Sequence, residues 1–200
     1  MDTFLLALGL SALYLAVVLL IELARRKLDI SSDITRRVIH IFSGIYTVLD
    51  YFLLPAAWFL SLIFISLVVM TISQRLNWFT SIHGVKRKTY GEVFLPLGTL
   101  ITYAISQGKP EIFIPSMFIM TFADSFAGLT SDMLKKERKV IQGSLVFFVI
   151  AFLLLIENTH LELGQIFACA LIVTLVERFS PVGSDNATVP VATALLLLAL

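Results

Sequence analysis

An aspartate stands inside a stretch of the chain that is otherwise apolar. Asp124 lies in the run IMTFADSFAGLT, within or at one end of an expected membrane span. An ionised carboxylate is costly in lipid, so such a residue marks a functional site by default. Its small neighbours leave room for a ligand, although they would equally let helices pack closely around a polar contact. We therefore predict Asp124 as a site residue, with helix packing as the alternative.

Two more carboxylates come near the end of the chain. Glu177 ends an apolar run, and Asp185 and Asn186 follow after a short segment whose proline and glycine indicate a tight turn. The turn would return Asp185 to the level of Glu177. Three carboxylates with basic residues nearby are typical of a site for Mg²⁺ and nucleotide phosphates. The alternatives are Asx-type capping of the last helix by Asp185 and Asn186, and pairing of Glu177 at the interface with Arg178 or another base.

Basic and small residues accompany these carboxylates. The segment KVIQGSLVFF places Lys139 ahead of Gly143 and Ser144, at the start of an expected helix. Free backbone N–H groups at a helix start can hold phosphate, and Lys139 can neutralise it. The alternative for Ser144 is an ordinary helix N-cap.

Further basic groups open two other spans. Arg37 and His40 share one helical face of TRRVIHIFSGI, because residues three and four apart are neighbours on a helix. Lys88 precedes Gly91 in KRKTYGEVFLPLG. These residues could complete a positive clamp around phosphate. The alternatives are anchoring at the membrane interface, helix capping and, for His40, a polar packing contact.

The composition indicates which elements must position these side chains. Of the 200 residues, 58% are hydrophobic and 14% charged, and the mean hydropathy is +0.93. Soluble domains carry about 25% charged residues. The apolar runs are continuous and do not alternate, which predicts membrane helices and excludes a soluble domain or a barrel. We expect an all-α polytopic bundle of seven to eight transmembrane helices, at residues 3–24, 38–54, 56–73, 91–107, 112–131, 143–157, 163–178 and 187–200.

The basic residues predict how the bundle lies in the membrane. Of the 15 Lys and Arg residues, all but Lys109 fall in expected loops on one side, around 25–37, 74–90, 132–142 and at 178. The positive-inside rule places these loops in the cytoplasm and both termini outside. The carboxylates then lie at the cytoplasmic face. We expect residues 1–200 to form a single integral domain in the cell membrane of a prokaryote or its equivalent.

Five segments, taken together, resemble one protein family. They are similar in order and spacing to the CTP-dependent polyprenol, dolichol and phytol kinases of membranes, which are related to phosphatidate cytidylyltransferases. The resemblance runs from about residue 36 to the end and leaves 1–35 as an additional span and basic loop. The segments are RRVIHIFSG (36–44), KRKTYGEVFLPLG (86–98), FADSFAGL (122–129), KVIQGSLVFF (139–148) and VERFSPVGSDNATVP (176–190).

The resemblance implies a transferase that moves the γ-phosphoryl group of CTP to the hydroxyl of an isoprenoid alcohol. The alcohol would be phytol, farnesol, geranylgeraniol, a polyprenol or dolichol, and Mg²⁺ would be the cofactor. The implied metal ligands are Asp124 and Asp185. The implied nucleotide and phosphate ligands are Arg37, Lys88, Lys139, Gly143, Ser144 and Asn186. The implied catalytic residues are Asp124, Glu177, Lys139 and His40.

The sequence departs from the family at two points. Gln142 stands where the family usually has glutamate, and TSDMLKKERK lacks the glycines of the usual loop. A glutamate that acted as base or metal ligand could not be replaced by Gln142. Gln142 therefore keeps an inactive lipid-binding homologue as one rival function. The other rivals are a cytidylyltransferase that makes a CDP-lipid, and a lipid transporter or flippase. The expected partners are CTP, a membrane lipid alcohol and the bilayer, with a homodimer left open and no nucleic acid.

Overall fold

The computed structural model describes residues 2–76, 89–134 and 139–200, and every regular element in these ranges is a helix. This confirms the all-α polytopic membrane bundle predicted from the continuous apolar runs. The chain divides into two compact units, residues 1–86 and 87–200, each described by itself.

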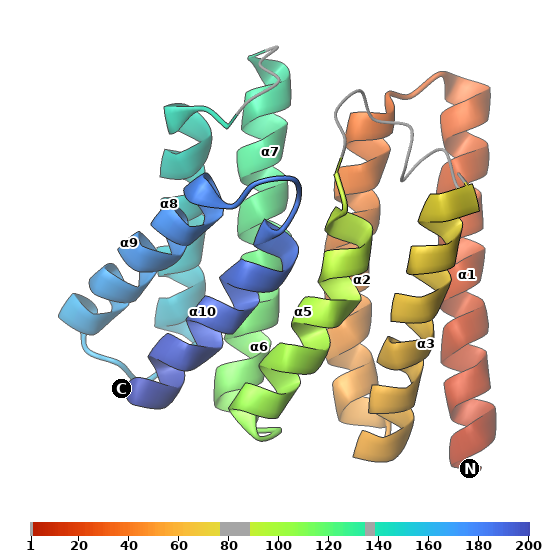
Figure 1. Ribbon diagram of the computed structural model, residues 1–200, viewed down its shortest axis with the longest axis horizontal. Helices are drawn as coiled ribbons and strands as arrows, with labels where there is room; N and C mark the ends of the chain where they lie inside the picture. The colour runs from red at the N-terminus through yellow and green to blue at the C-terminus, as the bar shows by residue number, and fades with distance from the viewer. Residues whose placement is uncertain (1, 77–88, 135–138) are drawn as a thin grey trace. The chain divides into compact units, whose positions relative to one another are not determined.

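In the residues of the first unit that the structure describes, the chain forms three long helices, α1 (Thr3–Leu28), α2 (Ser32–Leu53) and α3 (Ala56–Leu76) (Figure 1). Val18 of α1 and Ile39 of α2 are buried against each other. Tyr14, Ile21 and Met70 pack around them. This small apolar core joins all three helices.

The connection between α1 and α2 is shorter than the hydropathy pattern predicts. Asp29 ends α1 in the left-handed conformation with φ of 49°, and the hydroxyl of Ser31 caps α2 by accepting from the Ile34 N–H at 3.4 Å. The expected loop at 25–37 is therefore wrong, because its basic residues stand on helix ends. Hydropathy marks where lipid contact ends, whereas capping decides where a helix ends.

The second unit contains the other helices of the described residues. In this unit α10 packs against α5, α6 and α9, and α8 packs against α7 and α9 (Figure 1). The elements are α5 (Gly91–Ser106), α6 (Pro110–Phe118), η1 (Ile119–Ala123), α7 (Asp124–Met133), α8 (Ile141–Asn158), α9 (Leu163–Phe179) and α10 (Asp185–Ala199).

A π-helical turn interrupts the helix that carries Asp124. The helix is continuous from α6 through η1 into α7, and Asp124 is the first residue after the π turn. A π turn holds one more residue than an α turn and often stands at a functional site. It therefore sets the face of the helix on which Asp124 emerges, which the apolar run expected at 112–131 does not reveal.

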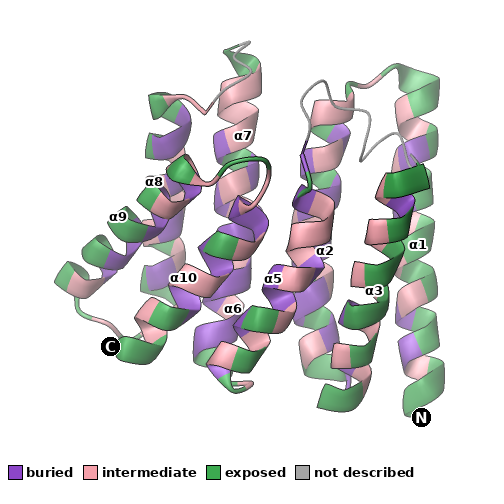
Figure 2. Ribbon diagram, viewed as in Figure 1, coloured by how far each residue is buried: buried purple, intermediate pink, exposed green. Residues whose placement is uncertain are grey.

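Four helices are long and apolar enough to cross a membrane among the residues that were searched: Thr3–Leu28, Ala56–Leu76, Pro110–Met133 and Ile141–Asn158. The helices α5 and α10 are apolar but shorter. Large apolar side chains are exposed on several helices, as the exposed stretches of α1 and α3 illustrate (Figure 2). Such surfaces suit contact with lipid.

Candidate active site

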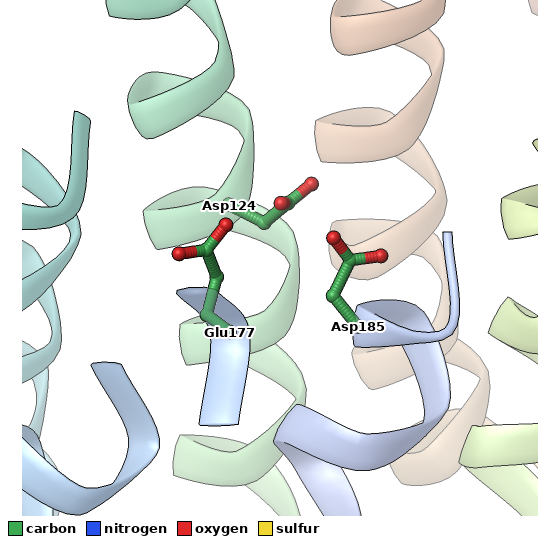
Figure 3. Close-up of side chains that lie close together, drawn as sticks. All are labelled: Asp124, Glu177 and Asp185. Atoms are coloured by element: carbon green, nitrogen blue, oxygen red, sulfur yellow. The ribbon is translucent and has the colours of Figure 1, made fainter. Parts of the chain in front are cut away.

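Three carboxylates from three helices converge in the second unit. Asp124 begins α7, Glu177 lies in the last turn of α9, and Asp185 begins α10 (Figure 3). One oxygen atom from each carboxylate lies within 4.8 Å of the others. Glu177 and Asp185 are 3% and 6% exposed, whereas Asp124 is half-buried. This is the proximity that the sequence predicts.

A tight turn brings Asp185 back to Glu177. Val182 and Gly183 both adopt positive φ angles, 55° and 83°, so the chain reverses directly after α9. The Ser184 N–H donates to the Pro181 carbonyl at 2.9 Å and closes the turn. The proline and glycine of this segment thus predicted the reversal correctly.

Lys139 joins two of the carboxylates. Its Nζ lies 2.7 Å from Asp185 Oδ2 and 2.8 Å from Glu177 Oε1, and it also donates to the backbone carbonyl of Glu177. Burial alone would lower the pKa of Lys139, but Asp185 and Glu177 outweigh it and raise the pKa, so the ammonium stays charged. The alternative predicted for Glu177, pairing with Arg178 or another basic residue, is confirmed, and the base is Lys139.

The cluster has the donor atoms and the charge that a divalent metal ion requires. Its three carboxylates and one ammonium carry a formal charge of −2. Carboxylate oxygens are the ligands that Mg²⁺ prefers. Asp124, Glu177 and Asp185 therefore fit a divalent cation.

Asp185 has both a local and a distant partner. Its Oδ1 accepts from the Asn186 N–H at 3.1 Å, while its Oδ2 pairs with Lys139. The N-cap of α10 is Ser184 and no side chain caps this helix, so the predicted alternative of Asx-type capping is wrong.

The start of α5 holds the segment around Asp185. The Tyr90 N–H donates to the Val182 carbonyl at 3.0 Å, and Asn186 Nδ2 donates to the Gly91 carbonyl at 2.8 Å. Within the described residues, Asn186 Oδ1 is buried and accepts no hydrogen bond from protein. The amide is therefore fixed in orientation, and its oxygen remains available to a donor from a ligand or water.

Glycines let α5 and α10 approach at backbone distance. A Cβ on Gly98 would overlap the carbonyl oxygen of Asn186 and lie 2.6 Å from the Ala187 Cα. A Cβ on Gly183 would overlap the Thr89 hydroxyl and lie 2.7 Å from the Gly91 nitrogen. This contact was not predicted from the sequence. The signal for it was the glycines of the segments KRKTYGEVFLPLG (86–98) and VERFSPVGSDNATVP (176–190).

The start of α8 has structural partners of its own. The N-cap is Val140, so the alternative of Ser144 as N-cap is wrong. Ser144 Oγ instead accepts from Arg178 Nη1 at 3.0 Å. A Cβ on Gly143 would lie 2.8 Å from the Ala127 carbonyl oxygen, so this glycine allows α8 to approach α7. Phosphate binding by Gly143 and Ser144 stays a prediction.

The structure does not test the other residues that the sequence singled out. Arg37 and His40 are buried side chains of α2, 7% and 9% exposed, in the first unit. Lys88 lies outside the described residues. Gln142 is exposed in the first turn of α8. The roles of these residues stay predictions.

The chain is similar to a phytol kinase from Synechocystis sp. The two are 29% identical over an alignment of 212 residues that covers 95% of this chain and 89% of the relative. The similarity therefore takes in most of the first 35 residues as well as the five motifs. No protein-family model matches the chain, and no solved structure matches it significantly.

Proposed function

We propose that this protein is a kinase that phosphorylates the hydroxyl of a membrane isoprenoid alcohol, with CTP as the phosphoryl donor. The similarity to a phytol kinase along nearly the whole chain supports a lipid-alcohol kinase. The resemblance of the five motifs to CTP-dependent enzymes supports CTP.

The observation that carries this proposal is the cluster of Asp124, Glu177, Asp185 and Lys139. Phosphoryl transfer depends on positioning and charge neutralisation more than on covalent chemistry. Glu177, Asp185 and Lys139 stand at or next to the ends of apolar helices, which suits a substrate whose hydroxyl reaches the interface while its tail stays in lipid.

The different burial of the carboxylates supports different roles. Glu177 and Asp185 are buried and share one cation, Lys139, so we assign them to the metal ion. Asp124 is more exposed, so we assign it as the base that the substrate hydroxyl meets. When bound, Mg²⁺ would neutralise phosphate charge and help to orient the donor. Asn186 Oδ1 would accept a hydrogen bond from the nucleotide or from water.

The reaction then proceeds in one displacement. The alcohol oxygen forms a bond to the γ-phosphorus of CTP, and the bond from that phosphorus to the β–γ bridging oxygen breaks. The hydroxyl proton passes to the Asp124 carboxylate. The bridging oxygen leaves with CDP, and the other product is the lipid monophosphate.

The test is a nucleotide-release assay on the full chain in detergent or liposomes with Mg²⁺. CTP, UTP and ATP are each offered with phytol, farnesol, geranylgeraniol, a polyprenol and diacylglycerol. We expect CDP and a phosphorylated isoprenoid alcohol in equal amounts. Asp124→Asn should lower kcat by about 10²–10⁴-fold, because general-base catalysis contributes that much.

Each of the other possible outcomes would indicate a different function. Release of pyrophosphate in place of CDP would identify a cytidylyltransferase. Release of UDP or ADP without CDP would show that UTP or ATP, and not CTP, is the phosphoryl donor. Phosphorylation of diacylglycerol alone would reject the isoprenoid substrate. No turnover with any pair would reject the kinase, and lipid movement without nucleotide consumption would identify a transporter.

A further inference from the structure

The ammonium group of Lys139 is the cation that contacts both Glu177 and Asp185. An ammonium group has three N–H donors. The three acceptors around Lys139 Nζ are Asp185 Oδ2, Glu177 Oε1 and the Glu177 carbonyl. The hydrogen-bonding capacity of the ammonium is therefore used within the cluster.

This arrangement conflicts with a simple view of Lys139 as a phosphate ligand. Lys139 cannot bond to phosphate and keep all three of these partners. If the ammonium left, Glu177 and Asp185 would remain as neighbouring buried carboxylates without their shared cation, which is unfavourable. Another cation must therefore replace the ammonium when Lys139 turns to phosphate.

We propose that Lys139 and the divalent metal ion exchange places. The metal ion arrives with the nucleotide and replaces the ammonium between Glu177 and Asp185, and the released ammonium bonds to a nucleotide phosphate. This inference rests on the proposed function for the identity of the nucleotide, but the competition between lysine and metal is a property of the cluster alone.

The surroundings of Lys139 favour movement of the lysine over movement of the carboxylates. The Lys139 side chain is 22% exposed, whereas the side chains of Glu177 and Asp185 are 4% and 8% exposed. Lys139 lies two residues before the first residue of α8 and carries its charge on a flexible four-carbon stem. Glu177 and Asp185 stand on α9 and α10, so their backbones are held within helices.

The exchange links metal binding to nucleotide binding. A metal ion that binds alone displaces the ammonium without giving it a new partner. A metal ion that binds with a nucleotide supplies that partner in the phosphate. The metal and the nucleotide should therefore each bind more tightly in the presence of the other, and both effects should require Lys139.

The first experiment measures Mn²⁺ affinity in the absence of nucleotide and lipid. The full chain in detergent is compared with Lys139→Met, which keeps an unbranched side chain and removes the charge. We expect Lys139→Met to bind Mn²⁺ roughly tenfold more tightly, because a competing positive charge has gone. Lys27→Met, at an exposed lysine, is the matched control and should leave the affinity unchanged.

The same variants are then compared with nucleotide present. Adding CTP should tighten Mn²⁺ binding in the wild-type chain and should do so much less in Lys139→Met. Unchanged or weaker Mn²⁺ binding by Lys139→Met without nucleotide would overturn the exchange.

A second experiment avoids any substitution and so stands even if Lys139→Met fails to fold. An amine-acylating reagent is applied to the wild-type chain, and modification of each lysine is read by mass spectrometry. Saturating Mn²⁺ should increase the modification of Lys139, and CTP with Mn²⁺ should reduce it again. Lys109, an exposed lysine, is the internal control. Equal Lys139 modification with and without Mn²⁺ would reject the exchange.

These measurements separate the exchange from the proposed function. Neither uses a lipid alcohol or measures turnover. Competition between the metal ion and Lys139 without any lipid phosphorylation would reject the proposed kinase function and would support the exchange. Lipid phosphorylation without competition would support the kinase and reject the exchange.

Discussion

At the scale of single residues, position 142 raises the sharpest question. The resemblance predicts a glutamate there, and the chain has Gln142, which is exposed in the first turn of α8. The carboxylates that converge are instead Asp124, Glu177 and Asp185. The cluster therefore holds three acidic groups without any contribution from residue 142.

We predict that introducing a glutamate at this position has little effect on catalysis. Gln142→Glu changes an exposed side chain, and exposed substitutions usually alter energies by less than about 0.5 kcal/mol. Both kcat and KM for CTP should therefore change by no more than about twofold. Steady-state kinetics with the preferred alcohol make the measurement.

Glu157→Gln provides the comparison, because Glu157 is also exposed and lies at the far end of α8. A tenfold rise in kcat for Gln142→Glu, but not for the comparison variant, would show that residue 142 acts in the reaction.

At the scale of elements, apolar runs predicted the start of each helix to within two residues, with α2 as the exception. The span expected at 143–157 is α8 at Ile141–Asn158, a difference of one or two residues. The span expected at 38–54 is α2, which begins six residues earlier at Ser32. The first turns of α2 are polar, so hydropathy could not reveal them. They form because the hydroxyl of Ser31 caps the helix.

The candidate site was predictable where local chemistry fixed it. The turn after α9 followed from its proline and glycine, and it explains why Asp185 returns to Glu177. The partner of Lys139 was not predictable, because the contact joins residues 38 and 46 positions apart in the sequence. Likewise, only the packing of α5 on α10 shows why Gly98 lacks a side chain.

The contact between α5 and α10 predicts a specific sensitivity at Gly98. In Gly98→Ala the new Cβ would meet backbone atoms of Asn186 and Ala187, which cannot rotate away. We expect a loss of about 1–3 kcal/mol in stability, typical of overpacking. Because α10 carries Asp185, Mn²⁺ binding should also weaken. Thermal unfolding in detergent and Mn²⁺ titration make the two measurements.

Gly9→Ala is the matched control, since Gly9 also lies inside a helix and a Cβ there would meet nothing within 4 Å. This variant should keep its Mn²⁺ affinity and be at least as stable as the wild-type chain, because alanine favours helices. Equal behaviour of the two variants would show that α5 does not position Asp185.

At the scale of the whole molecule, the unequal distribution of basic residues predicts orientation in the membrane. Lys27 belongs to the basic group at the end of α1, and Lys109 stands at the turn before α6. Both are exposed. The positive-inside rule places Lys27 in the cytoplasm and Lys109 outside.

We predict that cysteines at these two positions react from opposite sides. The background is Cys169→Ser, which removes the one native cysteine. In intact cells a membrane-impermeant maleimide should label Lys109→Cys, because it faces outward, and should label Lys27→Cys only after permeabilisation. Labelling from the same side at both positions would reject this orientation.

The π turn before Asp124 has a consequence for how this site is inherited. The turn holds one residue more than an α-turn needs between Ile119 and Ala123, so Asp124 emerges on the face that the preceding position would occupy in an uninterrupted α-helix. Loss of a single codon in this stretch would let the turn close as an ordinary α-turn and would leave Asp124 on the same face. We therefore expect relatives that lack one residue here to keep the aspartate and to lack the π turn.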